Sequence, residues 1–592
     1  MDAKSNVKLV DCVTGLCLLL IVPGGVFGQE VPPPPAPLSE SAPAGPVVAP
    51  AQNKPLSFPE RIAQARGPDL DQIEVELGQS LRQDTFAATT PDAAWQHRWL
   101  MREWVALKKS LETGGPEAPE IREETWRWLV SDPDLSMEFR SNRGTKPRAA
   151  LLILQELHDR FPERFPAYHS LATAFAWVWS QPLNAQMHGQ TGGALIPMDE
   201  SSVADRFSFY AEGNEALPAR LAFDLRKLRA GELKYVVDTP VSLAELQWAQ
   251  ANVKGSREQF ERVYSSIRYD EARLNAGQYQ WPGADYSLAA IQKNGGICVD
   301  QGYFAAVAGK ARGIPTLLFT GPGRRGGHAW IGYMKAPGRW EMEVGRYTFD
   351  KYATGTTLDP VTRKPITDHE LEFLGKGYRQ QPQFEASEWL TRAAALRDGN
   401  QVAEAVALCD RAIALENRNL EAYWVKAGVL EKSGNGPALE ALYKGMVARF
   451  SNNADIRTEA QRRLVELYES QGRSAEARQV QDSMVRRNAG ERHDLSLEVV
   501  RESLRKKVEA DDYAGALREY KSATRRFEME TGAMLGLLMD LAAACAARGE
   551  VKTARDAVKY SRDNLRFDPI TQRQFEKISA TVEDQWKNRN KK

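Results

Sequence analysis

The chain has 592 residues, of which 26% are charged and 42% hydrophobic, and its 78 basic residues are balanced by 78 acidic ones. This length suits about three or four domains, and the composition is that of a globular protein. A net charge of zero argues against a nucleic-acid-binding protein, which usually has a basic excess.

The first 28 residues have the pattern of a secretory signal peptide. Lys4 and Lys8 precede an apolar stretch from Val13 to Val22, and Gly28 offers a small residue for cleavage. This stretch is shorter than the roughly 20 residues that span a bilayer, and no other candidate span follows. A buried helix is the alternative. The prediction is an exported protein, periplasmic or extracellular, either cleaved or tethered by its uncleaved N-terminal segment.

Residues 29–56 are rich in proline and are predicted to be a disordered linker, because such a composition cannot bury a core. Residues 57–252 are predicted to be a helical region. Within it, the segment Arg148–Trp179 predicts two helices joined by a turn, since its apolar periodicity breaks at two prolines. The loop Gln181–Pro197, rich in glycine and amides, is expected to cover another part of the molecule.

Between about residues 253 and 375 the chain changes to short helices and strands. Two helices are predicted at Ser256–Ala276 and Tyr286–Lys293, and a third begins at Cys298 and ends at Gly313. The predicted strands are Thr316–Thr320, His328–Tyr333 and Trp340–Val344.

Cys298 stands at the start of a predicted helix, after the glycine pair Gly295-Gly296 and Ile297. The first turn of a helix offers unpaired N–H groups and the positive end of the helix dipole, which both favour a thiolate. The same N–H groups could hold the oxyanion of a tetrahedral intermediate, and the glycines would let a substrate approach the sulfur. His328, on a strand thirty residues later, is the candidate base. A buried structural cysteine is the alternative for Cys298.

The segments GGICVDQGYFAAVAGKARGIP and GGHAW resemble the transglutaminase-like superfamily, whose core is related to papain. In that family the order is the catalytic cysteine, a histidine in an H-A-W strand, and an aspartate at or beyond the end of the next strand. The resemblance implies acyl transfer to or from amides through a thioester, with Cys298 as nucleophile and His328 as base. It covers only the central part of the chain.

The aspartate expected from the family is missing from its usual place. Glu343 is the nearest carboxylate, but strict alternation would put it on the face opposite Trp340 unless a bulge intervenes. Asp350 is the alternative acid, and a dyad without an acid is the third reading. The acid would orient the imidazole and stabilise its cation.

A second donor for the oxyanion hole is sought before Cys298. Gln292 is the first candidate, and Gln280 and Trp281 are alternatives. No cofactor motif and no metal-ligand spacing occurs in the sequence, so neither a cofactor nor a metal is expected.

From residue 386 to 592 the chain is predicted to be a helical solenoid. Units of about 34 residues with a glycine at the turn resemble the tetratricopeptide repeat, which has two helices per unit. An irregular helical bundle is the alternative. Cys409 and Cys545 are predicted to be small core residues. The units are Ala386–Asn419, Leu420–Asn453 and Ala454–Arg487, with degenerate ones near Asp512–Ala523 and Gly549–Ser561.

Together these features predict a multidomain, mainly α protein. An α+β core of papain/transglutaminase-like type is flanked by the N-terminal helical region and the tetratricopeptide-like α-solenoid. The expected function is that of an exported cysteine-dependent amide acyltransferase or peptidase with a peptide or protein substrate and a protein partner bound by the repeats. The alternative is a non-catalytic scaffold, in which the repeats bind a partner and the core is inactive.

Overall fold

The structure is a computed structural model, and its described residues are mainly helical with one five-stranded antiparallel sheet. This confirms the mainly α class. The predicted signal segment 1–28 lies outside the described residues, as does the linker 29–56 apart from Leu56. In the described part of the chain, no helix is both long and apolar enough to cross a membrane. The described ranges are 56–83, 93–112, 120–142, 144–183, 188–217, 220–323, 326–346, 354–375, 389–390, 393, 401–490 and 492–589.

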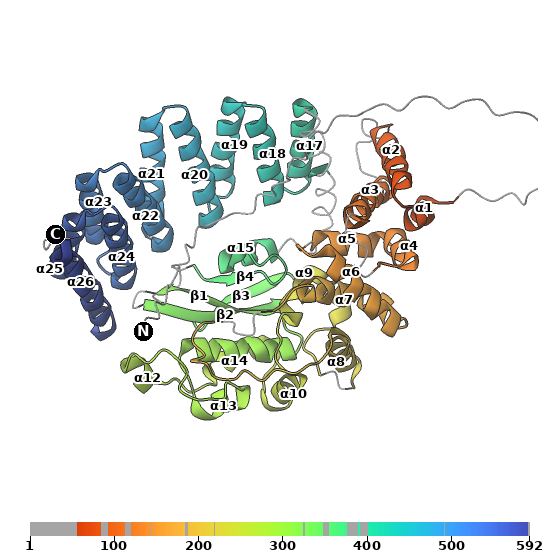
Figure 1. The fold of residues 1–592 in the computed structure, drawn as a ribbon, viewed down its shortest axis with the longest axis horizontal. Helices are drawn as coiled ribbons and strands as arrows, with labels where there is room; N and C mark the ends of the chain where they lie inside the picture. The colour runs from red at the N-terminus through yellow and green to blue at the C-terminus, as the bar shows by residue number, and fades with distance from the viewer. Residues whose placement is uncertain are drawn as a thin grey trace, which may run out of the picture.

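The N-terminal region consists of helices packed on one another (Figure 1). Residues 148–179 form the two helices predicted there, α6 and α7. Each has a proline in its first turn, Pro147 and Pro166, where the missing N–H leaves no helical bond unmade. The helices are α1 Phe58–Gln64, α2 Pro68–Gln83, α3 Ala93–Glu112, α4 Glu123–Ser131, α5 Pro133–Ser141, α6 Pro147–Arg160, α7 Phe165–Trp179, α8 Val203–Glu215, η1 Leu225–Lys227, α9 Ala230–Val237 and α10 Leu243–Asn252.

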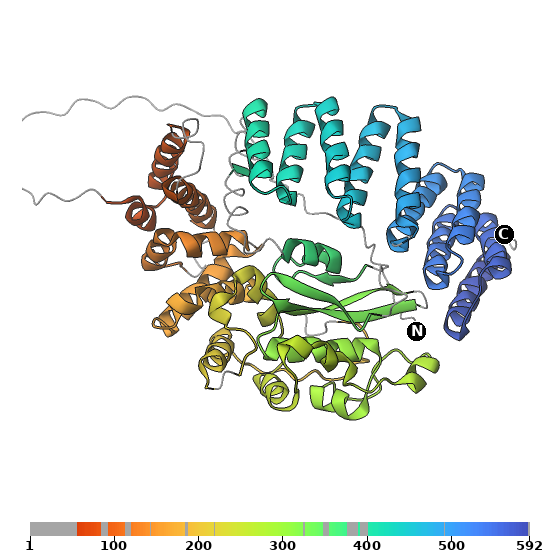
Figure 2. The same ribbon diagram turned by 180° about the vertical axis from the view of Figure 1, so that it is seen from behind.

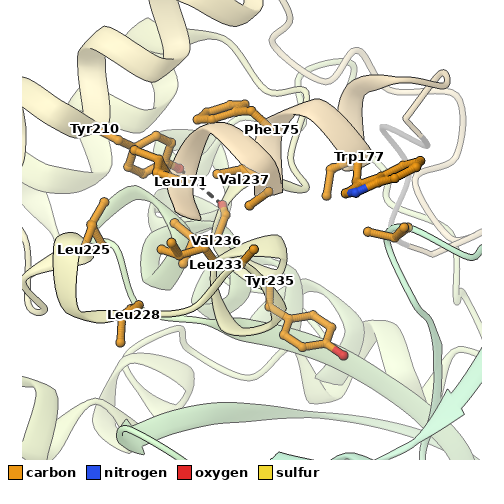
Figure 3. Close-up of a cluster of buried hydrophobic side chains, with 14 of the residues drawn as sticks. Leu171, Phe175, Trp177, Tyr210, Leu225, Leu228, Leu233, Tyr235, Val236 and Val237 are labelled. Carbon is orange, nitrogen blue, oxygen red and sulfur yellow. Dashed lines mark hydrogen bonds between the residues drawn. The ribbon is translucent and has the colours of Figure 1, made fainter. Parts of the chain in front are cut away.

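The centre of this region is a cluster of buried apolar side chains from α7, α8 and α9 (Figure 3). The ring of Phe175 on α7 lies against Tyr210 of α8, with ring centroids 6.1 Å apart. The Tyr210 hydroxyl is 3.3 Å from the carbonyl oxygen of Val236 on α9. It is also 3.2 Å from that of Lys310 on α14 (Cys298–Ala311). The cluster is therefore fixed to the helix that begins at Cys298.

The stretch predicted as one helix, Ser256–Ala276, is broken into three pieces, so that prediction is wrong. The break occurs where the backbone pairs with Gly296, just before Cys298. Gly296 N–H donates to the Arg268 carbonyl at 2.9 Å, and Asp270 N–H donates to the Gly296 carbonyl at 3.0 Å. This long-range pairing overrides the local helical pattern. The pieces are η2 Arg257–Gln259, α11 Glu261–Ser265 and α12 Glu271–Asn275.

The next two helices lead to the sheet. α13 (Leu288–Asn294) begins two residues later than predicted because the Ser287 hydroxyl caps it, accepting from the Ala290 N–H at 3.1 Å. α14 begins at Cys298 as predicted and is buried along its whole length. It ends just before Gly313, whose φ of +68° reverses the chain.

The sheet has the strand order β3-β2-β1-β4-β5, and every neighbouring pair is antiparallel. The three predicted strands are confirmed as β1, β2 and β3. α14 covers one face of the sheet and α15 (Asp368–Gly375) lies over the other (Figures 1 and 2). The strands are β1 Thr316–Gly323, β2 Gly326–Ala336, β3 Arg339–Val344, β4 Thr356–Leu358 and β5 Pro365–Thr367.

An array of helices from residue 402 onward arches over the sheet (Figures 1 and 2). The pairs α18–α19 and α20–α21 coincide with the predicted units Leu420–Asn453 and Ala454–Arg487, whereas the first predicted unit is only partly described. The degenerate units correspond to α23 and α25. The helices are α17 Val402–Leu415, α18 Leu420–Lys432, α19 Gly436–Arg449, α20 Ala454–Ser470, α21 Ser474–Asn488, α22 His493–Glu509, α23 Tyr513–Arg526, α24 Thr531–Ala547, α25 Val551–Asn564 and α26 Pro569–Arg589.

Two cysteines belong to the interior of this array. Cys409 on α17 and Cys545 on α24 are both fully buried among apolar side chains, as predicted. Cys298, Cys409 and Cys545 are free thiols in the described part of the chain. Each array cysteine therefore acts as a small apolar residue that fills space between helices.

The array is docked on the core at several points. Phe373 of α15 packs on Phe450 at the end of α19, with ring centroids 5.9 Å apart. Arg492, just before α22, donates from Nη2 to the Thr354 hydroxyl of the core at 2.6 Å. The Thr354 hydroxyl in turn contacts Asp494. α24 also contacts β1 and β2, the two strands of the hairpin that bears His328.

Candidate active site

Cys298 is the first residue of α14, at the end of the helix where backbone N–H groups have no helical partner. The N–H groups of Cys298, Val299 and Ala329 all interact favourably with the thiolate form. Cys298 is 8% exposed and counts among the buried residues of the core. The start of the helix thus provides the N–H groups that the sequence predicted, and β2 adds one more.

The two glycines before Cys298 are required by the protein itself. Gly295 has a φ of +79°, and a Cβ there would lie 2.5 Å from the carbonyl oxygen of Arg268. A Cβ on Gly296 would overlap the side chain of Asp300. We expected these glycines to leave room for a substrate, but backbone and side-chain atoms of the chain already occupy that space.

His328 lies on β2 opposite Gly321 of β1 and is 6% exposed. Its Nε2 is 2.7 Å from the carbonyl oxygen of Gly345, just past the end of β3. A carbonyl can only accept, so Nε2 carries the ring proton. In the neutral imidazole the lone pair is then on Nδ1. That tautomer is the one in which Nδ1 can take up a proton.

Cys298 and His328 are brought to the same edge of the sheet. β3 pairs with β2 only from Ile331 onward. At Ala329 the same side of β2 is therefore not covered by β3, and other groups can approach its backbone. The sulfur of Cys298 approaches the N–H of Ala329, the residue after His328. The Tyr264 hydroxyl lies 2.8 Å from the Ala329 carbonyl oxygen and 3.3 Å from that of Cys298. One tyrosine thereby joins the start of α14 to the strand that carries the histidine.

The surroundings favour the neutral forms of both the Cys298 thiol and the His328 imidazole. Burial raises the pKa of the Cys298 thiol, and nearby Asp300 raises it further, while the surrounding N–H groups act in the opposite direction. Burial lowers the pKa of His328, the Gly345 carbonyl partly offsets this, and the cation of Arg346 lowers it further. We expected the start of the helix to favour the thiolate, but the loss of solvent outweighs the N–H groups.

Of the two acid candidates, the structure describes Glu343. A β-bulge of the kind required does occur, since Ile331 pairs with Val344 but Tyr333 pairs with Glu341. Glu343 is nevertheless exposed, while Met342 and Val344 on either side of it are buried. The carboxylate thus lies on the outer face of β3, and its role as the acid stays a prediction.

The other acid candidate, Asp350, lies outside the described residues. The observed acceptor for His328 Nε2 is a backbone carbonyl. A carbonyl can fix the tautomer and the ring orientation, as a carboxylate would, but it brings no full negative charge to stabilise an imidazolium.

The side-chain candidates for the oxyanion hole are engaged elsewhere or exposed. Gln280 Oε1 accepts from the Gly192 N–H at 3.0 Å, and Trp281 Nε1 donates to the Asp285 carbonyl at 3.0 Å. Gln292 is exposed on α13. Gln292 therefore stays a prediction, and the N–H groups at the start of α14 are the donors nearest the sulfur.

Sequence reasoning missed a group of buried polar residues behind Cys298. Asp300, Arg273, Tyr286 and His188 are joined by hydrogen bonds within the core. Asp300 had a recognisable signal, because an acidic residue in the first turn of a helix often caps that helix. His188 had none, since it lies far away in the sequence, in the loop that was expected to cover another part of the molecule.

The arrangement brings a thiol, a base of defined tautomer and N–H donors to the same edge of the sheet. Among the described residues, no group of three or more His, Cys, Asp and Glu side chains is arranged to hold a metal ion. No protein-family model matches the chain, and no curated protein matches it either. The chemistry of the site therefore has to be argued from its own geometry.

Proposed function

We propose that this protein is an exported cysteine-dependent enzyme of the transglutaminase-like type, which transfers or hydrolyses a peptide-like amide through a thioester. One observation carries the proposal. The Tyr264 hydroxyl lies within hydrogen-bond distance of the carbonyls of both Cys298 and Ala329, the residue after His328, and Nε2 of that histidine donates to the Gly345 carbonyl. A nucleophile and a base held by a third group are what thiol catalysis requires.

The reaction begins from the neutral pair. Nδ1 of His328 takes the proton from the thiol as the sulfur attacks the amide carbonyl carbon. The negative oxygen of the tetrahedral intermediate is stabilised by N–H groups at the start of α14. The C–N bond breaks, and the imidazolium gives its proton to the leaving amine. Water or a second amine then attacks the thioester, His328 takes the proton of that nucleophile, and Cys298 leaves as the thiol.

The Gly345 carbonyl has a defined part in this scheme. It keeps the ring proton on Nε2, which leaves the lone pair on Nδ1 to accept a proton. A carbonyl in this position fixes the tautomer of the ring, which is one of the two tasks of the acid in a triad.

The test is to trap the thioester. The full chain is incubated with a mixture of synthetic peptides, quenched in acid and digested, and the Cys298 peptide is searched for an acyl adduct that hydroxylamine removes. We expect the adduct in the natural chain and none in Cys298→Ala. His328→Ala should slow its formation by about 10²- to 10⁴-fold. An adduct that forms at an unchanged rate in His328→Ala would refute the assignment of the base.

A second candidate is the non-catalytic scaffold, and the burial of the site favours it. Cys298 and His328 are 8% and 6% exposed, and burial favours the neutral form of both groups. In that case the array binds a protein partner and the core serves only as its support. The scaffold predicts no adduct with any peptide and a Cys298 that is alkylated no faster than Cys409 and Cys545.

A further inference from the structure

A chain of buried polar side chains ends in the first turn of α14. Asp300 Oδ2 accepts from the Ile297 N–H at 2.8 Å and from Arg273 Nη1 at 2.7 Å. Asp300 Oδ1 accepts from the Tyr286 hydroxyl at 2.7 Å. That hydroxyl lies 2.8 Å from Nε2 of His188. All four side chains are buried, so water does not compete for these hydrogen bonds.

His188 determines which group donates and which accepts along this series of hydrogen bonds. Its Nδ1 accepts from the Gln190 N–H at 3.1 Å, so the ring proton is on Nε2 and is donated to Tyr286. Burial, with a smaller contribution from the cation of Arg273, lowers the pKa of His188 to about 4, so the ring is neutral at physiological pH. Tyr286 is then left with its single O–H for Asp300. Each hydroxyl, ring nitrogen and carboxylate oxygen along this path has a defined role.

These hydrogen-bonded side chains connect three segments that are far apart in the sequence. Arg273 donates from Nε to the Gln278 carbonyl at 3.0 Å and from Nη2 to the Tyr279 carbonyl at 2.8 Å. The described part of the 181–197 loop is joined to the same place, because Trp281 N–H donates to the Gln190 carbonyl at 2.9 Å. All of these segments are therefore fixed to the first turn of α14, where Cys298 begins the helix.

We infer that Tyr286 is a positioning residue for the Cys298 thiol. Its hydroxyl holds Asp300, which folds back onto the Ile297 N–H, and this fixes the turn whose N–H groups face the sulfur. The inference rests on the proposed function, since the alignment of the thiol matters chemically only if Cys298 is a nucleophile. Tyr286 acts through Asp300 and forms no bond with the substrate.

The physical effect concerns the thiolate. N–H groups aimed at the sulfur stabilise its anion, whereas burial and the charge of Asp300 oppose it. A first turn released from Asp300 would lose the alignment of these N–H groups but keep the burial. The thiolate would then be harder to form, and the sulfur would react more slowly at any given pH.

The test compares Tyr286→Phe with Tyr303→Phe in the full chain. Tyr303 is an ideal control because its buried ring packs on that of Tyr286, with centroids 4.9 Å apart, while its hydroxyl takes no part in the chain. Iodoacetamide is the probe. The alkylation rate of Cys298 is followed by mass spectrometry of its peptide from about pH 6 to pH 10, and Cys409 and Cys545 serve as internal references.

We expect Tyr286→Phe to slow the alkylation of Cys298 by about three- to tenfold, the size of one lost hydrogen bond, and to move its pH midpoint upward. Tyr303→Phe should leave both unchanged. General loosening of the fold would act in the opposite direction, because all three cysteines would then react faster. An unchanged Cys298 rate in Tyr286→Phe, or faster labelling of all three cysteines, overturns the inference.

A second pair of variants covers the case in which Tyr286→Phe does not fold. His188→Gln keeps an N–H donor toward Tyr286, and His188→Leu removes it. The inference requires that His188→Leu slows the alkylation of Cys298 and that His188→Gln restores it. The proposed function fails separately, because it requires the thioester adduct in the natural chain, whereas this comparison needs only the reactivity of the thiol.

Discussion

Replacing Arg492 by Met should destabilise the helical array where it meets the core. The guanidinium donates from Nη1 to Asp455 Oδ2 at 2.7 Å and from Nη2 to the Thr354 hydroxyl at 2.6 Å. Nε also donates to Asp494 Oδ1 at 3.0 Å. Methionine keeps much of the apolar stem but leaves both carboxylates without their cation.

The size of the effect follows from burial. The side chain of Arg492 is 7% exposed, and those of Asp494 and Asp455 are 12% and 28% exposed. Removing one partner of a buried ion pair costs about 3–5 kcal/mol. Because Asp455 still reaches water, we expect the lower end, about 3 kcal/mol of the free energy of unfolding of the array, since both carboxylates belong to the array itself.

The assay is the urea or thermal unfolding of the full chain, read together with limited proteolysis between the core and the array. The control is Arg501→Met, which breaks the half-exposed ion pair with Asp540 in the same array and should cost at most about 1 kcal/mol. The Arg492 cation holds the pKa of Asp455 below its ordinary value. The array should therefore also lose stability as the pH falls through the lowered pKa of Asp455. Equal unfolding and equal proteolysis for the two variants would refute the reasoning.

Four further predictions concern the site. The alkylation rate of Cys298 should still be rising at about pH 9, because burial raises its pKa; a plateau near neutral pH would contradict this. Thioester formation should be lost on the acid side only below the ordinary pKa of histidine, since the pKa of His328 is lowered and its neutral form is the base; a pH–rate profile in the adduct assay checks this limb. Gly345→Ala should both destabilise the fold, by about 1–3 kcal/mol in urea unfolding, and impair the adduct, because φ is +90° and a Cβ would overlap the Tyr264 ring; unchanged values in both assays would rule out the role of that carbonyl. Glu343→Gln should form the adduct within about twofold of the natural rate, whereas a loss of 10² or more would restore Glu343 as the acid.

Part of the fold could be predicted because its signals are local. Cys298 begins a helix after a glycine turn, Gly313 follows its end, and three strands come next at the predicted places. The helix pairs of the array follow from their repeating apolar positions. The stretch Ser256–Ala276 failed for the opposite reason, since its break is caused by pairing with Gly296, and no neighbour in the sequence signals such a contact.

The site divides in the same way. Cys298 and His328 were predicted from their residue types and from the elements that carry them. The acceptor on His328 Nε2 was not, because a backbone carbonyl of Gly345 has no side-chain signature in a sequence. The hydrogen bond from His188 to Tyr286 joins residues 98 apart, and a lone histidine in a loop gives no sign of such a partner.

The contact between Arg492 and Thr354 also sets an order of events during synthesis. The two residues are 138 apart, and a ribosome adds about 5–20 residues per second. Roughly 7 to 28 s therefore pass between the appearance of the core loop and that of its anchor. For that interval the nascent core exists without its hydrogen bond to Arg492. Every chain that stops short of residue 492 keeps the hairpin of His328 but never acquires the helix α24 that contacts it.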